Sequence, residues 1–82
     1  MDYADRIFQL RQSRELTRKQ LATSAGLSEE AVKGYEKRTR MPAYPYLLAL
    51  ADFFNVSLDY IAGRTDDPTP PKTTTTAQAL TA

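Results

Sequence analysis

The stretch LATSAGLSEEAVKGYE, residues 21–36, contains two helical segments separated by a very short break. The first segment ends at Gly26, and the second begins at Ser28 after a single leucine. Glycine accepts the positive φ that an abrupt change of chain direction requires, and serine is a preferred helix N-cap. We therefore expect two short helices, about 18–25 and 28–37, that meet at a steep angle as a helix-turn-helix unit.

Other helix starts follow the same pattern, in which a Ser or Thr cap has an apolar residue before it and another four positions after it. The pattern occurs in LTRKQL from Leu16, LSEEAV from Leu27 and VSLDYI from Val56. Asp2 can cap an earlier helix, and Pro45 suits the first turn of a helix that Asn55 can close in a left-handed conformation. Because no segment alternates with period two, we predict an all-α fold of five short helices.

The 82 residues include no cysteine and no histidine. Disulfides, thiolate metal sites and histidine-based catalysis are therefore excluded. No Gly-rich phosphate loop or pocket with paired carboxylates is evident, so we expect no enzyme, no catalytic residue, no metal, no cofactor and no small-molecule ligand. We also expect neither a signal peptide nor a membrane span, since no apolar run approaches ~20 residues.

The segment TDDPTPPKTTTTAQALTA, residues 65–82, contains Leu80 as its one large apolar residue. Such a segment buries too little surface to offset its ordering entropy. We predict a folded domain over residues 1–64 and a disordered tail or linker over residues 65–82.

Within the domain, we assign four aromatic residues mainly to the core: Phe8, Tyr46, Phe53 and Phe54. Because Phe53 and Phe54 are adjacent, one of the two must face more outward.

Basic residues are concentrated at the end of the quoted stretch. Four cations fall within eight residues, opposed by Glu36 alone: Lys33, Lys37, Arg38 and Arg40. When Val32 faces the core, Glu36 also faces inward on the helical wheel, and Arg11, one turn past Ile7, is its natural partner. We expect an Arg11–Glu36 ion pair; the alternative is that both side chains reach solvent unpaired. We interpret Arg6, Arg14 and Arg64 as solvated surface residues.

The stretch TRKQLATSAGLSEEAVKGYEKRTRMP, residues 17–42, followed by LLALADFFNVSLDYIAGR, residues 47–64, resembles the phage Cro/repressor (XRE-like) DNA-binding domains. The resemblance covers about residues 6–64 and implies the five-helix lambda-repressor-like fold. It also implies the same Arg–Glu pair. Two departures add charge: Arg18 stands where the family usually has glutamine, and Arg38 where it usually has glycine.

The resemblance further implies that the helix over about 28–37 enters the major groove, while the preceding helix lies across the DNA backbone. Arg18 would then contact a phosphate, and residues from Ser28 to Gly34 would reach base edges. The expected DNA-binding residues are Thr17, Arg18, Lys19, Ser28, Glu29, Glu30, Lys33, Gly34, Lys37, Arg38 and Arg40.

Several of these residues have a second interpretation. Glu29 or Glu30 can accept a hydrogen bond from a cytosine amino group, but acidic residues in a first helical turn also stabilise the helix dipole. Gly34, in mid-helix, indicates that something approaches the backbone closely, or it is simply tolerated. The basic cluster over residues 33–40 contacts DNA, or it is ordinary solvated surface.

We therefore expect a sequence-specific double-stranded DNA-binding transcriptional regulator in the cytoplasm of a prokaryotic or phage-infected cell, acting as a repressor on a pseudo-palindromic operator. The resemblance implies a homodimer, with a dimer patch at Phe53, Tyr60 and Ile61. The alternative is a protein-interaction module such as an antitoxin or adaptor, which an acidic helix carrying Glu29 and Glu30 would suit. Duplex binding that weakens steeply with salt distinguishes the two.

Overall fold

Five α-helices account for the regular structure of residues 1–69, the part of the chain that this computed structural model describes. They are α1 (Tyr3–Ser13), α2 (Arg18–Ala25), α3 (Glu29–Lys37), α4 (Tyr44–Phe54) and α5 (Leu58–Ile61). Residues 1–69 contain no strand, so the predicted all-α class is confirmed. None of the helices in this range combines the length and the apolar character that crossing a membrane requires.

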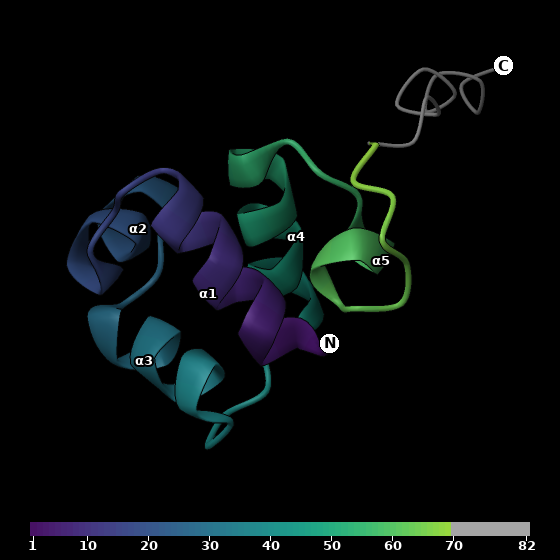
Figure 1. Ribbon diagram of the computed structural model, residues 1–82. Helices are drawn as coiled ribbons and strands as arrows, with labels where there is room; N and C mark the ends of the chain where they lie inside the picture. The colour runs from purple at the N-terminus through teal and green to yellow at the C-terminus, as the bar shows by residue number, and fades with distance from the viewer. Residues whose placement is uncertain (70–82) are drawn as a thin grey trace, which may run out of the picture.

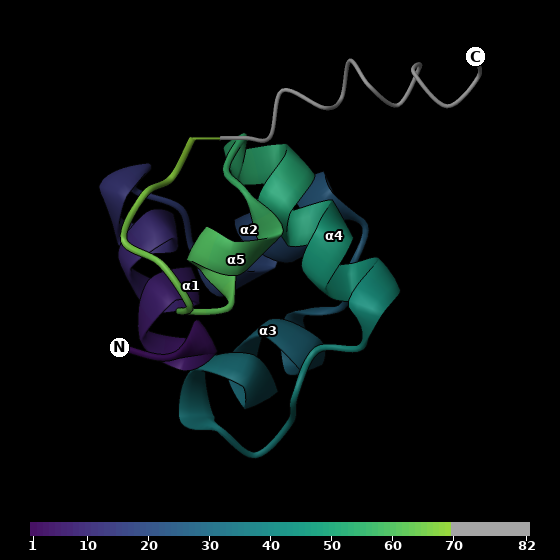
Figure 2. The ribbon, with the colours of Figure 1, turned by 90° about the vertical axis from the view of Figure 1, so that its right-hand side faces the viewer.

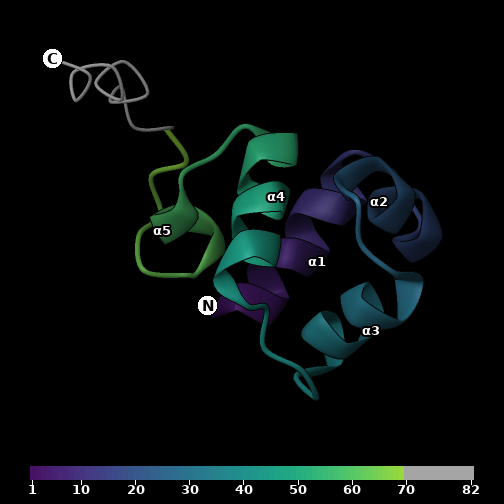
Figure 3. The same cartoon turned by 180° about the vertical axis from the view of Figure 1, so that it is seen from behind.

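Helices α1 and α4 lie in the middle of the domain, with α2 and α3 at one end and α5 at the other (Figure 1). The view from behind shows the same order (Figure 3). Each helix contributes one large, fully buried aliphatic side chain to the core: Ile7, Leu21, Val32, Leu50 and Ile61. Because burying such a side chain contributes about 1.5–3 kcal/mol, the five helices stabilise one another through a single shared core.

The turn between α2 and α3 has the conformation that the sequence predicts. Gly26 has φ 78° and ψ 32°, in the left-handed region. The Leu27 N–H donates a hydrogen bond to the Ala22 carbonyl oxygen at 2.8 Å, which closes the end of α2. Ala22 is buried, and its small side chain allows the two helices to pack closely.

The predicted caps are also confirmed. The Thr17 hydroxyl accepts from the Gln20 N–H at 3.0 Å while the Gln20 side chain accepts from the Thr17 N–H at 2.8 Å, which completes the capping box. Ser28, Ser57 and Asp2 each accept a bond from the N–H three residues later. Asn55 ends α4 with φ 56°. These side chains satisfy N–H groups that have no partner within the helices, so the local sequence fixes where the helices begin.

Two of the aromatic residues predicted for the core are exposed. Phe8 is 46% exposed and Tyr46 is 49% exposed, whereas Phe54 is buried and Phe53 is partly buried. Phe8 follows Ile7 directly, about 100° further round the helix, so the buried Ile7 turns Phe8 toward the surface. Its ring lies 5.4 Å from the Arg11 guanidinium, which it partly covers. The prediction that one of the Phe53–Phe54 pair faces outward is confirmed.

The prediction that Arg6 is a solvated surface residue is wrong, because Arg6 is only 4% exposed. Its guanidinium lies 3.9 Å from the centre of the Tyr60 ring and donates to the Tyr60 carbonyl oxygen at 2.9 Å. Arg14, which is exposed as predicted, donates to the carbonyl oxygens of Phe53 and Phe54 at the end of α4. Both arginines therefore connect α1 to the second half of the domain.

The contacts of the folded domain continue past the boundary predicted at residue 64. Arg6 donates to the Thr65 carbonyl oxygen at 3.1 Å, and the Ser57 N–H donates to the Pro68 carbonyl oxygen at 3.1 Å. Residues 65–69, which the sequence places in the predicted tail, therefore lie beside α5 and contact the folded domain. The rest of the predicted tail, residues 70–82, lies outside the described residues.

Candidate nucleic-acid interface

The outer face of α3 carries the residues for which the sequence analysis predicts contact with the major groove. Ala31, Val32 and Tyr35 are buried on the inner face of the helix. The outward-facing side chains are exposed, and they are Glu29, Glu30, Lys33 and Lys37. The helix and the turn before it therefore hold these four charged groups in fixed positions on the surface.

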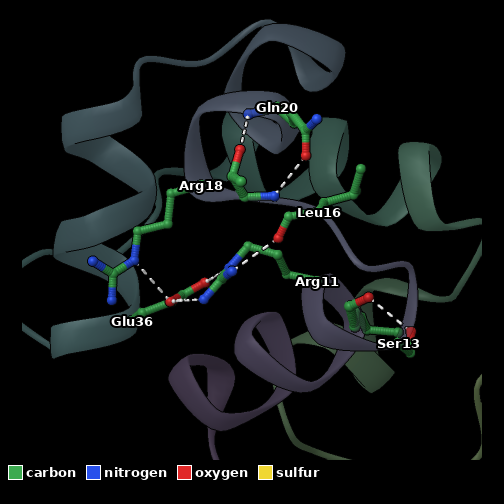
Figure 4. Close-up of polar contacts among 8 residues, drawn as sticks. Arg11, Ser13, Leu16, Arg18, Gln20 and Glu36 are labelled. Carbon is green, nitrogen blue, oxygen red and sulfur yellow. Dashed lines mark hydrogen bonds and ion pairs between the residues drawn. The ribbon is translucent and has the colours of Figure 1, made fainter.

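The inner face of α3 is anchored by the predicted ion pair, which is confirmed. The Arg11 guanidinium donates to both carboxylate oxygens of Glu36, from Nε to Oε2 at 2.6 Å and from Nη2 to Oε1 at 2.9 Å. Its Nη1 also donates to the Leu16 carbonyl oxygen at 2.9 Å. The Glu36 side chain is only 3% exposed, so this bidentate contact fixes α3 against α1 from inside the domain (Figure 4).

Arg18 contributes a second positive charge to Glu36. Its Nε donates to Glu36 Oε1 at 3.0 Å, and its side chain is 34% exposed. The sequence predicts a phosphate contact for Arg18 but does not predict its pairing with Glu36. Figure 4 shows Arg18 approaching the Glu36 carboxylate through its Nε atom. Because Arg11, Arg18 and Glu36 together carry one net positive charge, the outer edge of this cluster still favours an anion.

Arg38 is held by acidic groups on α1 in the described structure. Its guanidinium donates to both oxygens of Asp2, at 2.8 and 3.0 Å, and to Asp5 at 2.9 Å. The hydrogen bonds from Arg38 are the main reason that the pKa of the Asp2 carboxyl group is lowered from 3.8 to about 2. The same carboxylates raise the pKa of Arg38. Arg38, one of the predicted DNA-binding residues, therefore already has two carboxylate partners within the domain.

Gly34 is closely approached, but by another residue of the same chain. A Cβ atom at this position would lie 2.8 Å from Cγ and 2.9 Å from Cδ of Arg40. The Thr39 and Arg40 N–H groups both donate to the Gly34 carbonyl oxygen, at 2.9 and 3.2 Å. The sequence suggested DNA contact or simple tolerance, and the structure adds this third explanation. Gly34 is buried beneath the Arg40 side chain.

The remaining predicted DNA-binding residues are exposed. Lys19, Lys33, Lys37 and Arg40 form no ion pair within residues 1–69, and neither do Glu29 and Glu30. Thr17 and Ser28 are exposed but cap α2 and α3. Glu30, Lys33, Gly34, Lys37, Thr39 and Arg40 surround a small hollow on this face. Four cations are therefore available for anionic partners, mixed with two carboxylates.

The predicted dimer patch is wrong in one of its three residues. Ile61 is completely buried and belongs to the core. Tyr60 is partly buried, and its ring lies against Arg6. Phe53 is partly exposed. The cap pattern VSLDYI already places Ile61 as the inward residue of a hydrophobic staple, so the burial of this side chain was readable from the sequence.

A left-handed glycine that ends one helix, a second helix packed across the first, and a five-helix core around them define a helix-turn-helix domain. Residues 7–61 match the helix-turn-helix family of the XRE type, and the chain belongs to this family. The fold is the lambda-repressor-like fold that the sequence predicts. The family comprises DNA-binding transcriptional regulators and repressors.

Known proteins support the assignment. Over 68 residues, covering 83% of this chain, the sequence is 43% identical to YobD, an uncharacterized HTH-type transcriptional regulator of Bacillus subtilis (strain 168). The chain spans 61% of the length of that regulator. The P22 c2 repressor, solved in complex with a synthetic operator, superimposes with a TM-score of 0.74 at 25% identity, over 79% of this chain and 98% of the repressor chain. The restriction-modification controller protein C.AhdI of Aeromonas hydrophila superimposes with a TM-score of 0.67 at 25% identity, covering 72% and 89% of the two chains.

Proposed function

We propose that this protein is a sequence-specific transcriptional regulator that binds double-stranded DNA, with α3 in the major groove, and acts as a repressor. The observation that carries the proposal is the outer face of α3, where charged side chains stand exposed on a helix that is anchored from inside by Arg11 and Glu36. The likeness to the P22 c2 repressor, which was solved with a synthetic operator, supports this role for a chain of the same family.

The ion pairs within residues 1–69 indicate which cations are available for phosphate contacts. Lys19, Lys33, Lys37 and Arg40 are exposed and free of ion pairs within residues 1–69, so they are the first candidates for phosphate contacts. Each phosphate contact contributes about −0.9 to the log–log dependence of affinity on salt, so four of them give about −3.6 per protomer. Arg18 would add a further contact through its terminal guanidinium nitrogens, since its bond to Glu36 uses Nε.

Glu29 and Glu30 are then candidates for specificity. A carboxylate reduces affinity for phosphates generally, but it can accept a hydrogen bond from a cytosine amino group in the major groove. We propose Glu30 for this role, since it borders the same hollow as Lys33 and Lys37. We also propose that two protomers bind a pseudo-palindromic operator, with half-site centres ~10 base pairs apart. In a prokaryotic or phage-infected cell, such a dimer represses by occluding a promoter.

The test is a selection of bound duplexes from a random pool at moderate salt. The proposal predicts a pseudo-palindromic consensus. The selection is repeated with Glu30→Gln, which should change the base preferred at one position in each half-site. Asp52→Asn is the matched control, because it removes one exposed carboxylate from α4, and it should leave the consensus unchanged. Recovery of no sequence above background would refute the proposal.

One observation favours a second function, the protein-interaction module. Arg18 and Arg38, both among the predicted DNA-binding residues, form ion pairs with carboxylates in the described structure. Together with the exposed Glu29 and Glu30, this pairing makes the α3 face less basic than its composition suggests. A protein that fails to bind random-sequence duplex DNA even at low salt, yet stays folded, would support the interaction module.

A further inference from the structure

The segment after α3 is attached to the first turn of α1 at two points. On one side of Thr39, the Arg38 guanidinium makes three hydrogen bonds to the carboxylates of Asp2 and Asp5. On the other side, the Tyr3 hydroxyl donates to the Arg40 carbonyl oxygen at 2.9 Å. Figure 2 shows the beginning of α1 lying beside the end of α3. Residues nearly forty positions apart in sequence therefore hold one short segment from outside.

The same segment is also held from inside by the last turn of α3. The Gly34 carbonyl oxygen accepts hydrogen bonds from the N–H groups of Thr39 and Arg40. The Arg40 side chain then crosses over Gly34, close enough to exclude a Cβ atom there. The direction of the Arg40 side chain across the α3 face thus depends on the position of the backbone over residues 38–40.

Arg38 has a charge environment that does not suit a phosphate. Its single positive charge is opposed by the two carboxylates of Asp2 and Asp5, so the cluster has a net charge of −1. Three of its N–H bonds are already directed at those oxygens. A phosphate at this place would have to displace a bidentate contact and approach two negative groups.

The backbone of Arg38 adds an independent indication. Its φ is 62°, in the left-handed region where residues other than glycine are disfavoured. The left-handed conformation is less favourable for arginine than for glycine. The hydrogen bonds from the Arg38 guanidinium to Asp2 and Asp5 are interactions that a glycine at this position could not make.

We propose that Arg38 is a positioning residue rather than a phosphate ligand, and that with Asp2, Tyr3 and Asp5 it forms a clamp that sets residues 38–40, and hence Arg40, against the DNA. This inference rests on the proposed DNA-binding function. It assigns the first turn of α1 a role in binding although that turn itself contacts no DNA. We refer to these four residues as the α1 clamp.

The experiment is a double-mutant cycle in the whole chain, with Arg38→Gly combined with Asp2→Asn/Asp5→Asn. Glycine suits the left-handed backbone, and asparagine can still cap α1, so every variant is expected to fold. Affinity for the duplex recovered in the selection is measured over a range of salt concentrations. A clamp predicts that Arg38→Gly weakens binding several-fold in the wild-type background and clearly less in the Asp2→Asn/Asp5→Asn background.

The salt dependence separates the two roles of Arg38. In an Arg40→Ala background, where the clamp has no phosphate ligand left to position, Arg38→Gly should leave the log–log slope unchanged, whereas Lys37→Ala, the control for a phosphate contact, should make it less steep by about 0.9 per protomer. A slope reduced equally by both substitutions would overturn the proposal. The proposal would also be overturned if Arg38→Gly weakened duplex binding as much in the Asp2→Asn/Asp5→Asn background as in the wild type. A phosphate ligand released from its carboxylate partners should contribute more to binding, not less.

Amide hydrogen exchange tests the clamp without DNA. The Thr39 and Arg40 N–H groups should exchange faster in Arg38→Gly and in Asp2→Asn/Asp5→Asn, while the amides of α4 keep their rates. Unchanged exchange at Thr39 and Arg40 would overturn the clamp whether or not the protein binds DNA. If wild-type protein binds no duplex, the proposed function fails, and the exchange rates still decide whether the clamp exists.

Discussion

Replacing Arg11 by alanine removes the strongest polar contact inside the domain. Three hydrogen bonds are lost: two to the Glu36 carboxylate at 2.6 and 2.9 Å and one to the Leu16 carbonyl oxygen at 2.9 Å. The Glu36 side chain, 3% exposed, would keep only the single bond from Arg18. Breaking a buried pair in this way costs about 3–5 kcal/mol. Since Arg18 still neutralises the carboxylate, we expect about 3 kcal/mol, at the lower end of that range.

This loss is large for so small a domain. At about 0.05–0.15 kcal/mol per residue, a domain of this size has a free energy of unfolding of roughly 3–10 kcal/mol. With about 4–8 °C of melting temperature per kcal/mol, Arg11→Ala should melt about 12–24 °C below the wild type. Urea titration in the cold, followed by far-ultraviolet circular dichroism, measures the loss while the variant is still mostly folded.

Two further variants distinguish the ion pair from general damage to the core. Arg18→Ala removes one bond from a partly exposed side chain, and it should cost only about 0.5–1 kcal/mol. Arg11→Met with Glu36→Leu removes both charges, and it should cost less than Arg11→Ala alone because no unpaired carboxylate remains. The reasoning is refuted if Arg11→Ala loses less than about 1 kcal/mol, or if Arg18→Ala is the more damaging substitution.

Three other outcomes can be checked on the same protein. Gly26→Ala should lower the free energy of unfolding by about 1–2 kcal/mol in urea melts, because alanine is strained at φ +78°. No clash adds to this cost, since nothing lies within 4 Å of the added Cβ atom. An unchanged free energy of unfolding would contradict the left-handed turn. Gly34→Ala should change the free energy of unfolding by no more than about 1 kcal/mol, but it should displace Arg40 and weaken duplex binding several-fold in titrations. In an Arg40→Ala background the same substitution should leave binding unaffected. Unchanged affinity of Gly34→Ala alone would show that the position of Arg40 does not matter. Arg38 is the main reason that the pKa of the Asp2 carboxyl group is lowered from 3.8 to about 2, so the stability from that contact is fully present above pH 3.8 and is lost as the pH falls toward 2. Acid melts of Asp2→Asn should lack this loss, and a profile identical to the wild type would argue against the contact.

The features that the sequence predicts correctly are those fixed by neighbouring residues. The capping box at Thr17 and Gln20 needs only the chemistry of four consecutive positions, and the turn at Gly26 needs only a residue that accepts positive φ. The pairing of Arg11 with Glu36 joins two helices, but both residues lie on inward faces that a helical wheel identifies. A buried carboxylate requires a cation, which makes the pairing predictable.

The features that the sequence misses depend on where long side chains reach. Arg6 lies between Tyr3 and Leu10 on the apolar stripe of α1, which was a usable signal for its burial. Its partner Tyr60 is 54 residues away, and no local pattern indicates that contact. The attachment of Arg38 to Asp2 and Asp5 is of the same kind, since it arises only after α1 and α3 have packed together.

We propose that the exposed face of α3 is the surface that meets duplex DNA. Titrating isotope-labelled protein with the selected duplex, and following backbone amide resonances by NMR, tests it directly. If α3 lies in the groove, the largest shifts should occur from Ser28 to Lys37 and at the start of α2, and they should all diminish as salt is raised. Shifts confined to α4 and α5, or no shifts at low salt, would contradict it.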